Sequence, residues 1–531
     1  LELAVTNMTK HSEYFSVEGK GRDILGLFAN ETLTLFRFAH NDSDEVIVRA
    51  LFREEGDLLD LIENSELREC MGLVLGLVNF PLVRRPPVRR AYPTENSNRN
   101  LQTQTCSRVD SPNYITPDVL FSMYKVPDAE VSIPGDMPPS GPVMAVYEGT
   151  SVNVAEIDLK CFNIAYSLLD DSLTGDYEKY DVNLCGPNSC NEPNLDVQYL
   201  SAMNQGIDVS YQAYDSIGDM IVAALSWSES ELPFVMSISW GEEESPYYAS
   251  SMIQQCKEIG TLSARGMTFF ASTGDQGATN GRNGCGNTYN VNFPASCPYV
   301  TAVGATTGFS AGDEVVCNSH PSVITTGGGF STIFNEGAGF NLDFQKGQVE
   351  AYRDKMSSSL EGFPPSGRGL PDISAPGTNY IVKIDSSNAV LDGTSASSPV
   401  MAGITARIML ENNSSRLGCI NHVLYQNESI FFDVIEGQNS GDGKTAYCPP
   451  GANSRYMGFA ATSGWDAASG VGTIGTPDGY ASYEAVLTSS SLPAFPPTQA
   501  PSAASNLVPS LFRFPRTTLI FVFLIHTLGK I

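Results

Sequence analysis

A chain of 531 residues, of which 42% are hydrophobic and 17% charged, has the composition of a globular protein with a sizeable core. Its formal net charge of −28 would repel nucleic acid and anionic membrane surfaces, so nucleic acid is excluded as an expected partner. Many of the 59 Asp and Glu carboxylates become neutral in acid, so the charge suits an extracellular, lysosomal or vacuolar acid setting as well as a merely soluble acidic protein.

The eleven cysteines show no paired C-x-x-C spacing, so disulfides are favoured over a zinc site. Acceptor tripeptides of the Asn-x-Ser/Thr type, which also arise by chance, point to the secretory pathway; they begin at Asn7, Asn30, Asn41, Asn412, Asn413 and Asn427. The chain begins with Leu1 and no signal peptide is visible, which we interpret as an N-terminus that is missing or already removed.

The first part of the chain, residues 1 to about 83, alternates short apolar and polar runs and predicts a small α+β unit. The apolar runs cover residues 24–28, 32–38, 45–52 and 58–62. The unit ends in a basic string with two prolines, Arg84 to Arg90, and polar residues 95–105 follow. Such a stretch is too polar to fold by itself and is open to proteolysis. It is either a solvated linker or the processing junction of a zymogen.

From residue 112 to 488, apolar runs typical of buried strands alternate with amphipathic helices. The expected strands are 235–239, 267–271 and 299–303, and the expected helices include 248–263 and 399–411. This alternation favours a largely parallel sheet, whose functional sites lie at the carboxyl ends of the strands.

The C-terminal segment consists of a Ser/Pro-rich linker, residues 489–516, and an apolar tail, residues 517–531. The tail is too short to span a bilayer, which needs roughly 20 residues. Small residues at 502–504, a spacer and the tail resemble a lipid-anchor signal, which would attach the protein to a membrane. A buried terminal helix or an artefact of the gene model would give the same pattern.

One serine stands where a hydrolase would place a nucleophile. In Asp392-Gly-Thr-Ser-Ala-Ser-Ser-Pro-Val-Met-Ala402, Ser395 lies between a glycine turn and an apolar helix. Gly393 is expected to take backbone angles closed to other residues, and Pro399 is tolerated in the first turns of a helix. The unpaired N–H groups at that helix N-terminus would favour an oxyanion beside Ser395. An ordinary N-cap is the alternative.

A nucleophilic serine needs a base, and the five histidines do not supply one. Only His320 and His422 fall within residues 112–488, and neither lies in an H-G-T-H-like string. Glu192 and Asp196 are better candidates, because a helix starting near Pro193 would carry both on one face. A buried pair could share a proton, which raises one pKa, whereas a solvated pair would have no special role.

A further acid, Asp275, follows the expected strand 267–271 in the turn Gly274-Asp-Gln-Gly277. That position would lift Asp275 above the strand end. A protonated carboxyl there could donate to an oxyanion, which is worth about 3 to 4 kcal/mol per donor. Asp between glycines is otherwise an ordinary turn residue.

Six segments of residues 112–488 occur in a specific order: Glu192-x-x-x-Asp196, Ser237-Ile-Ser-Trp-Gly241, Asp275 in its glycine turn, Gly327-Gly-Gly-Phe-Ser331, Gly367-Arg-Gly-Leu-Pro-Asp-Ile-Ser-Ala375 and Gly393-Thr-Ser-Ala-Ser-Ser-Pro399. In this order they resemble the sedolisins, or serine-carboxyl peptidases, of the tripeptidyl peptidase I and kumamolisin group. The resemblance implies an α/β fold, namely a subtilisin-like domain with a mainly parallel sheet flanked by helices, and peptidase activity in acid.

The same resemblance implies a role for each candidate. Ser395 would be the nucleophile and Glu192 the general base, Asp196 would orient Glu192 and share its proton, and Asp275 would be an oxyanion donor that acts only when protonated. Gln276 departs from the family, in which serine is frequent at this position, and we expect it to alter the neighbouring subsite.

One structural Ca²⁺ ion is also implied, bound by two strings that contain Asp433 and Asp466. Its ligands would be the two carboxylates together with water and the carbonyl oxygens of Val434, Thr462 and Gly464. Thr462 stands where glycine is common, which matters only if its backbone angle is positive. An Asx turn at each aspartate is the alternative.

By resemblance, residues 1–90 are the C-terminal part of an α+β activation prodomain, 91–111 a processing linker and 112–488 the catalytic domain. The partners would be peptide or unfolded protein substrates and the chain's own prodomain, with a monomer as the default state. Removal of N-terminal tripeptides and internal cleavage both stay open. A catalytically silent, surface-anchored binding protein of the same fold is the competing hypothesis, and the missing histidine string disfavours a neutral subtilisin-like protease.

Overall fold

The computed structural model describes residues 106–489 except 129–130, 132–140, 151, 176–189, 280–288, 319–323, 357–362, 365, 413–415 and 441–457. Outside this range it describes the backbone of seven strands, six in the N-terminal part and one near the C-terminus.

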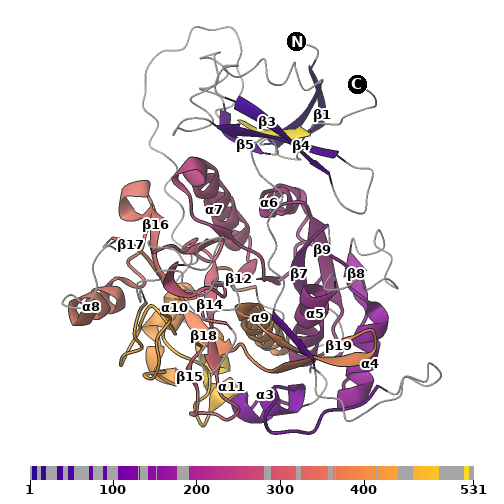
Figure 1. Ribbon diagram of the computed structural model, residues 1–531, viewed down its shortest axis with the longest axis vertical. Coiled ribbons are helices and arrows are strands. Elements are labelled where there is room, and N and C mark those ends of the chain that lie inside the picture. Colours follow the sequence, from indigo (N-terminus) through magenta and orange to yellow (C-terminus); the bar gives the residue numbers. More distant parts are fainter. Residues whose placement is uncertain are drawn as a thin grey trace.

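The centre of the molecule is an eight-stranded sheet with the order β15-β14-β12-β10-β7-β9-β8, in which β18 also pairs with β14 (Figure 1). Every pairing is parallel except that of β14 with β15. The strands are β7 Met144–Gly149, β8 Leu173–Gly175, β9 Val209–Tyr214, β10 Val235–Ile238, β12 Thr268–Ser272, β14 Thr301–Thr307, β15 Val315–Val316 and β18 Ile373–Pro376. The expected strands 235–239 and 267–271 are confirmed, and the third begins two residues later than expected, at Thr301.

Alternate residues of the sheet face two separate cores, because successive side chains of a strand point to opposite faces. In β7, Met144 and Val146 pack with α5 and α9, whereas Ala145 and Tyr147 pack with α6 and α7. The helices on these faces are α5 Asn191–Met203, α6 Ile217–Ser226, α7 Ala249–Ala264 and α9 Thr394–Glu411. Helix α7 confirms the prediction for 248–263, and the mainly parallel sheet flanked by helices confirms the predicted fold class.

The remaining helices and short strands surround this sandwich. They are α3 Pro117–Tyr124, α4 Glu156–Tyr166, α8 Lys346–Met356, α10 Asn421–Gln426, α11 Gly479–Leu487, the pair β11 Glu242–Glu243 with β13 Asn292–Phe293, the pair β16 Gly329–Asn335 with β17 Gly367–Leu370, and the hairpin β19 Tyr380–Ile384 with β20 Ser387–Asp392. Disulfides join Cys106 to Cys161 and Cys256 to Cys297, and Cys190 is also disulfide-bonded, which confirms the predicted use of cysteine.

The N-terminal strands form a separate β unit that contacts α7 through β5 (Figure 1). They are β1 Leu3–Met8, β2 Tyr14–Gly19, β3 Leu33–Ala39, β4 Val46–Phe52 and β5 Met71–Leu75. The hairpin β3–β4 coincides with the apolar runs 32–38 and 45–52, whereas 24–28 and 58–62 lie outside the described residues. One described part of the apolar tail, β21 Leu519–Leu524, is a strand that pairs in parallel with β2 and β5. The terminal-helix alternative is therefore wrong for these six residues.

Strand β6, Val88–Ala91, lies in a three-stranded sheet of the order β19-β20-β6, where it pairs with β20 in antiparallel fashion. Val88 lies opposite Asp392, three residues before Ser395. The C-terminal half of the basic string therefore pairs with the strand that leads into the candidate nucleophile.

Two local expectations around Ser395 were wrong. Helix α9 begins at Thr394, five residues before the expected start, so that Pro399 lies inside it. Gly393 has a φ of 171° and a ψ of 152°, which is extended backbone open to any residue. The chain enters the helix directly from the extended strand β20, so no left-handed turn is needed there.

In the described part of the chain, no helix combines the length and the apolar character needed to cross a bilayer.

Candidate active site

The two acids expected to act as a pair lie on a helix that is buried on every side. All thirteen residues of α5 are buried, so the solvated-face alternative is wrong. One side of α5 is tied to β19, because Asn194 Nδ2 and Gln198 Nε2 donate to the carbonyl oxygen of Lys383 at 3.1 and 2.9 Å. Glu192 and Asp196 are exposed by 1% and 0% and lie inside the protein.

Burial raises the pKa of both carboxyls well above the ordinary range, because a charged group loses solvation in the interior. The negative charge of each neighbouring carboxyl raises these values further, and the hydroxyls of Ser239 and Ser395 lower the pKa of Glu192. The four carboxyl oxygens of the pair make no hydrogen bond of ordinary geometry, so the Ser395 hydroxyl is near Glu192 but not yet in a tight bond with it. Loose contacts of this kind are common in unliganded active sites.

A third carboxyl, Glu148 at the end of β7, extends the pair. It is fully buried, and its negative charge raises the pKa of both Asp196 and Glu192. Trp240 Nε1 donates to Glu148 Oε2 at 2.7 Å. Sequence reasoning missed both residues as members of the site. Trp240 lies within the segment Ser237–Gly241 that contributed to the family resemblance, but the only sequence signal for Glu148 is its place at the carboxyl end of an apolar strand.

Ser395 is the second residue of α9, where main-chain N–H groups have no partner within the helix. Pro399 has no N–H to donate to the carbonyl oxygen of Ser395 four residues earlier. That oxygen accepts a hydrogen bond from Ser239 Oγ instead, at 3.3 Å. The loop after β10 is thereby attached to the candidate nucleophile, and Ser237 and Ser398 make a second link between β10 and α9 at 3.1 Å.

Helices α5 and α9 approach each other closely at Gly403. A Cβ atom there would lie 2.7 Å from the carbonyl oxygen of Leu200 and 2.8 Å from the Cβ of Met203. The close approach is possible because glycine has no side chain. It sets the separation between the helix that carries Glu192 and the helix that carries Ser395.

Asp275 follows β12, at the edge of the sheet where parallel strands end. Its Oδ1 accepts hydrogen bonds from the N–H and the hydroxyl of Thr394, at 2.8 and 2.9 Å. Negative charge on Asp275 also raises the pKa of Glu192. The structure thus brings together Ser395, Glu192, Asp196 and Asp275, from three different elements.

The residues expected to bind calcium lie on two adjacent loops. Gly464 N donates to Asp433 Oδ2 at 2.8 Å, and Ser469 Oγ donates to the carbonyl oxygen of Val434 at 3.3 Å. The Asp466 carboxyl accepts the N–H groups of Thr462, Ala468 and Ser469. The φ angle of Thr462 is not positive, so threonine is compatible with its backbone. Within the described residues, no three His, Cys, Asp or Glu side chains come together as a metal site.

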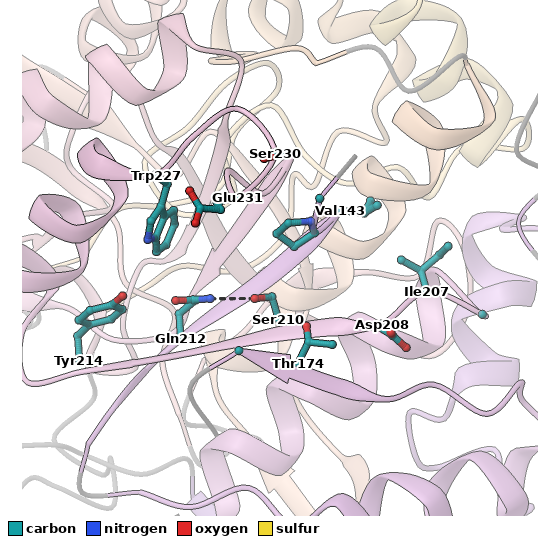
Figure 2. Close-up of a pocket in the computed structure, with 14 residues that line it drawn as sticks. Val143, Thr174, Ile207, Asp208, Ser210, Gln212, Tyr214, Trp227, Ser230 and Glu231 are labelled. Carbon is teal, nitrogen blue, oxygen red and sulfur yellow. Dashed lines mark hydrogen bonds between the residues drawn. The ribbon is translucent and has the colours of Figure 1, made fainter. Parts of the chain in front are cut away.

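A cavity of about 650 Å³ lies elsewhere, between β9 and the chain that follows α6 (Figure 2). Trp227 and Glu231 line one part of it, and Gln212 donates to Ser210 Oγ at 2.8 Å in another. None of the candidate catalytic residues lines this cavity, so it is separate from the site described above.

Comparison with known proteins first indicates the class of protein to which this sequence and fold are similar. The model of the subtilase family matches residues 202–442, a range that contains Asp275 and Ser395 but neither Glu192 nor Asp196. The fold matches that of Pseudomonas sedolisin, a serine-carboxyl proteinase solved with pseudo-iodotyrostatin, with a TM-score of 0.53 at 22% identity over 73% of this chain and 100% of that chain.

Two curated relatives narrow the class. The chain is 34% identical to tripeptidyl-peptidase SED3 of Arthroderma otae over 50% of its own length and 44% of the relative's. It is 28% identical to physarolisin of Physarum polycephalum over 83% of its length and 77% of the relative's. The sequence is thus similar to those of these two relatives, and the fold is similar to that of a sedolisin. The match of this chain spans less than half the length of the Arthroderma otae relative.

Proposed function

We propose that this protein is a serine-carboxyl peptidase that hydrolyses peptide bonds in acid. The observation that carries the proposal is the buried Glu192–Asp196 pair beside Ser395, the serine at the N-terminus of α9. A buried carboxyl pair with raised pKa values is costly to maintain and is characteristic of sites that transfer protons.

In the proposed reaction Ser395 attacks the carbonyl carbon of the peptide bond while Glu192 takes its hydroxyl proton. The tetrahedral intermediate collapses, the C–N bond breaks, and Glu192 returns the proton to the leaving amine. Water then attacks the acyl-enzyme with Glu192 again as base, which releases the acid product and restores Ser395. Asp196 orients Glu192 and shares its proton, and Glu148 keeps this proton within the buried cluster.

The oxyanion of the intermediate would be stabilised by main-chain N–H at the start of α9 and by the Asp275 carboxyl in its protonated form. An ionised Asp275 has no proton to donate, and its charge would repel the oxyanion. Activity should therefore be lost as the pH rises and Asp275 ionises, which accounts for an acid enzyme in place of a neutral one.

We also propose that the protein is made as a zymogen. Residues 1–90 would be the C-terminal part of the prodomain, 91–111 the processing linker, 112–488 the catalytic domain, 489–516 a linker and 517–531 a tail. The contact of β5 with α7 supports a prodomain that packs on the helical face of the catalytic domain. A single chain carries every candidate catalytic residue, which is compatible with a monomer.

A structural Ca²⁺ ion fits the two loops that contain Asp433 and Asp466, because all of the proposed ligands are hard oxygen donors. The carbonyl oxygens of Val434, Thr462 and Gly464 would complete the set with water. When bound, the ion would hold the two loops together. The disulfides support a secreted or lysosomal-type location, and the lipid anchor stays a prediction.

The proposal is tested with a free-amine peptide and its N-blocked form, incubated at about pH 4 and about pH 7 with the full chain after acid activation. We expect cleavage only in acid and none by Ser395→Ala. Preference for the free amine would indicate a tripeptidyl peptidase, and equal cleavage of both an endopeptidase. A folded, processed protein that cleaves neither peptide would refute the proposal and favour a silent, surface-anchored binding protein.

A further inference from the structure

We propose that Thr394 is a positioning residue of the oxyanion site, which holds one oxygen of Asp275 as an acceptor so that the other carries the acid proton. This inference rests on the proposed function, because it concerns the same oxyanion. It assigns a role to a side chain that takes no part in the proton transfer between Ser395 and Glu192.

Both donors of Thr394 converge on one atom. The N–H and the hydroxyl of Thr394 donate to Asp275 Oδ1 at 2.8 and 2.9 Å. The hydroxyl oxygen in turn accepts the N–H of Gly274 at 3.0 Å. The N–H of Gly274 thus uses one of the two lone pairs of the hydroxyl, and the single hydroxyl proton is donated to Asp275 Oδ1.

The arrangement is held firmly by its surroundings. Thr394 is 1% exposed and is the first residue of α9, directly before Ser395. Gly274 has a φ of 99°, a conformation that favours glycine, so its N–H can point back at Thr394. The N–H of Thr325 donates to the carbonyl oxygen of Asp275 at 3.1 Å and fixes the turn from the other side.

Two donors on Oδ1 decide which oxygen is protonated. A neutral carboxyl has one carbonyl-type oxygen, which accepts, and one hydroxyl oxygen, which donates. With the N–H and O–H groups of Thr394 both directed at Oδ1, this oxygen must be the acceptor, and the proton is on Oδ2. A free carboxyl could place its proton on either oxygen, so Thr394 preorganises the donor before the oxyanion forms.

Charged groups around Asp275 act in the opposite sense to Thr394. Glu192 on α5 faces it closely enough for the two charges to interact, and Asp196 on α5 and Glu148 on β7 are coupled to Glu192. These negative charges favour neutral Asp275, whereas hydrogen bonds donated by Thr394 favour the ionised form. Loss of the hydroxyl should therefore lower the rate and at the same time extend activity to higher pH.

The test compares Thr394→Val, which keeps the shape but loses the hydroxyl, with Thr394→Ser, which keeps the hydroxyl. For Thr394→Val we expect kcat, measured on the acid plateau of its pH profile, to fall about 10- to 100-fold with little change in KM. The alkaline limb of the same profile should move to higher pH by about half a unit. Thr394→Ser should recover the rate to within about threefold of the wild type and restore the alkaline limb. Thr394→Ala, which adds no methyl group to the site, should reproduce the Thr394→Val result and serves if the valine variant does not fold.

A double-variant cycle separates this role from a merely structural one. In an Asp275→Ala background the loss of the Thr394 hydroxyl should lower kcat by less than about twofold, since its target is absent. The proposal would be overturned if Thr394→Val and Thr394→Ser lowered kcat equally, or if Thr394→Val left both kcat and the alkaline limb of the pH profile unchanged. It would also be overturned if loss of the hydroxyl lowered kcat as much in the Asp275→Ala background as in the wild type. A wild type without any Ser395-dependent cleavage would instead refute the proposed function itself.

Discussion

Glu314 is a buried carboxyl that should make this protein more stable in acid than at neutral pH. It is 3% exposed and accepts hydrogen bonds from three neutral hydroxyls, those of Tyr124 at 2.9 Å, Thr306 at 3.3 Å and Thr473 at 2.6 Å. Burial raises the pKa of Glu314 to about 7, from an ordinary value of 4.5, and the three hydroxyls oppose the shift only in part.

The folded state thus binds the Glu314 proton more tightly than the unfolded state. The resulting stability is fully present below about pH 4.5 and is lost as the pH rises through about 7. The gap between a pKa of about 7 and one of 4.5, at about 1.4 kcal/mol for each pH unit, corresponds to about 3 kcal/mol.

The assay is denaturant unfolding of the full chain carrying Ser395→Ala, which prevents self-digestion, at about pH 4.5 and about pH 7.5. Glu314→Gln in this background should lose about 3 kcal/mol less stability between the two pH values than its parent. Glu350→Gln, at an exposed position on α8, is the matched control and should behave as the parent does. The reasoning is wrong if the Glu314→Gln protein keeps the full pH dependence of its parent.

Three further predictions test the site and its support. Glu148→Gln should move the acid limb of the kcat/KM profile to lower pH, because the Glu148 charge raises the pKa of Glu192 and Asp196; an unchanged limb would contradict the coupling. Gly403→Ala should lower the free energy of unfolding by about 1 to 3 kcal/mol and should lower kcat, because the added Cβ would force α5 and α9 apart. A variant with the melting temperature and kcat of the wild type would show that the two helices accommodate the Cβ. A calcium chelator should lower the melting temperature of the wild type but not that of Asp433→Asn, and equal melts with and without chelator in the wild type would remove the metal assignment.

The order of chemistry-bearing segments is a property of the sequence alone. Six segments in a fixed order, among them those of Ser395 and Asp275, resembled the sedolisins, and the comparisons support that resemblance. The strands at 235–239 and 267–271 were also predictable, because continuous apolar runs of that length are typical of buried parallel strands. The glycine argument at Gly393 failed, because a local rule does not reveal that the chain passes from extended β20 straight into α9.

The tertiary structure decided which acidic residues lie next to one another and which are removed from solvent. A Glu and an Asp four residues apart have the same sequence pattern on an exposed helix as on a buried one, and only the packing of α5 between β19 and α9 removes Glu192 and Asp196 from water. Glu148 and Thr394 lie far from Glu192 and Asp275 in sequence, so no spacing rule connects them. They meet because parallel strands end at one edge of the sheet and because α9 starts at that edge, which is a consequence of the fold and not of any local segment.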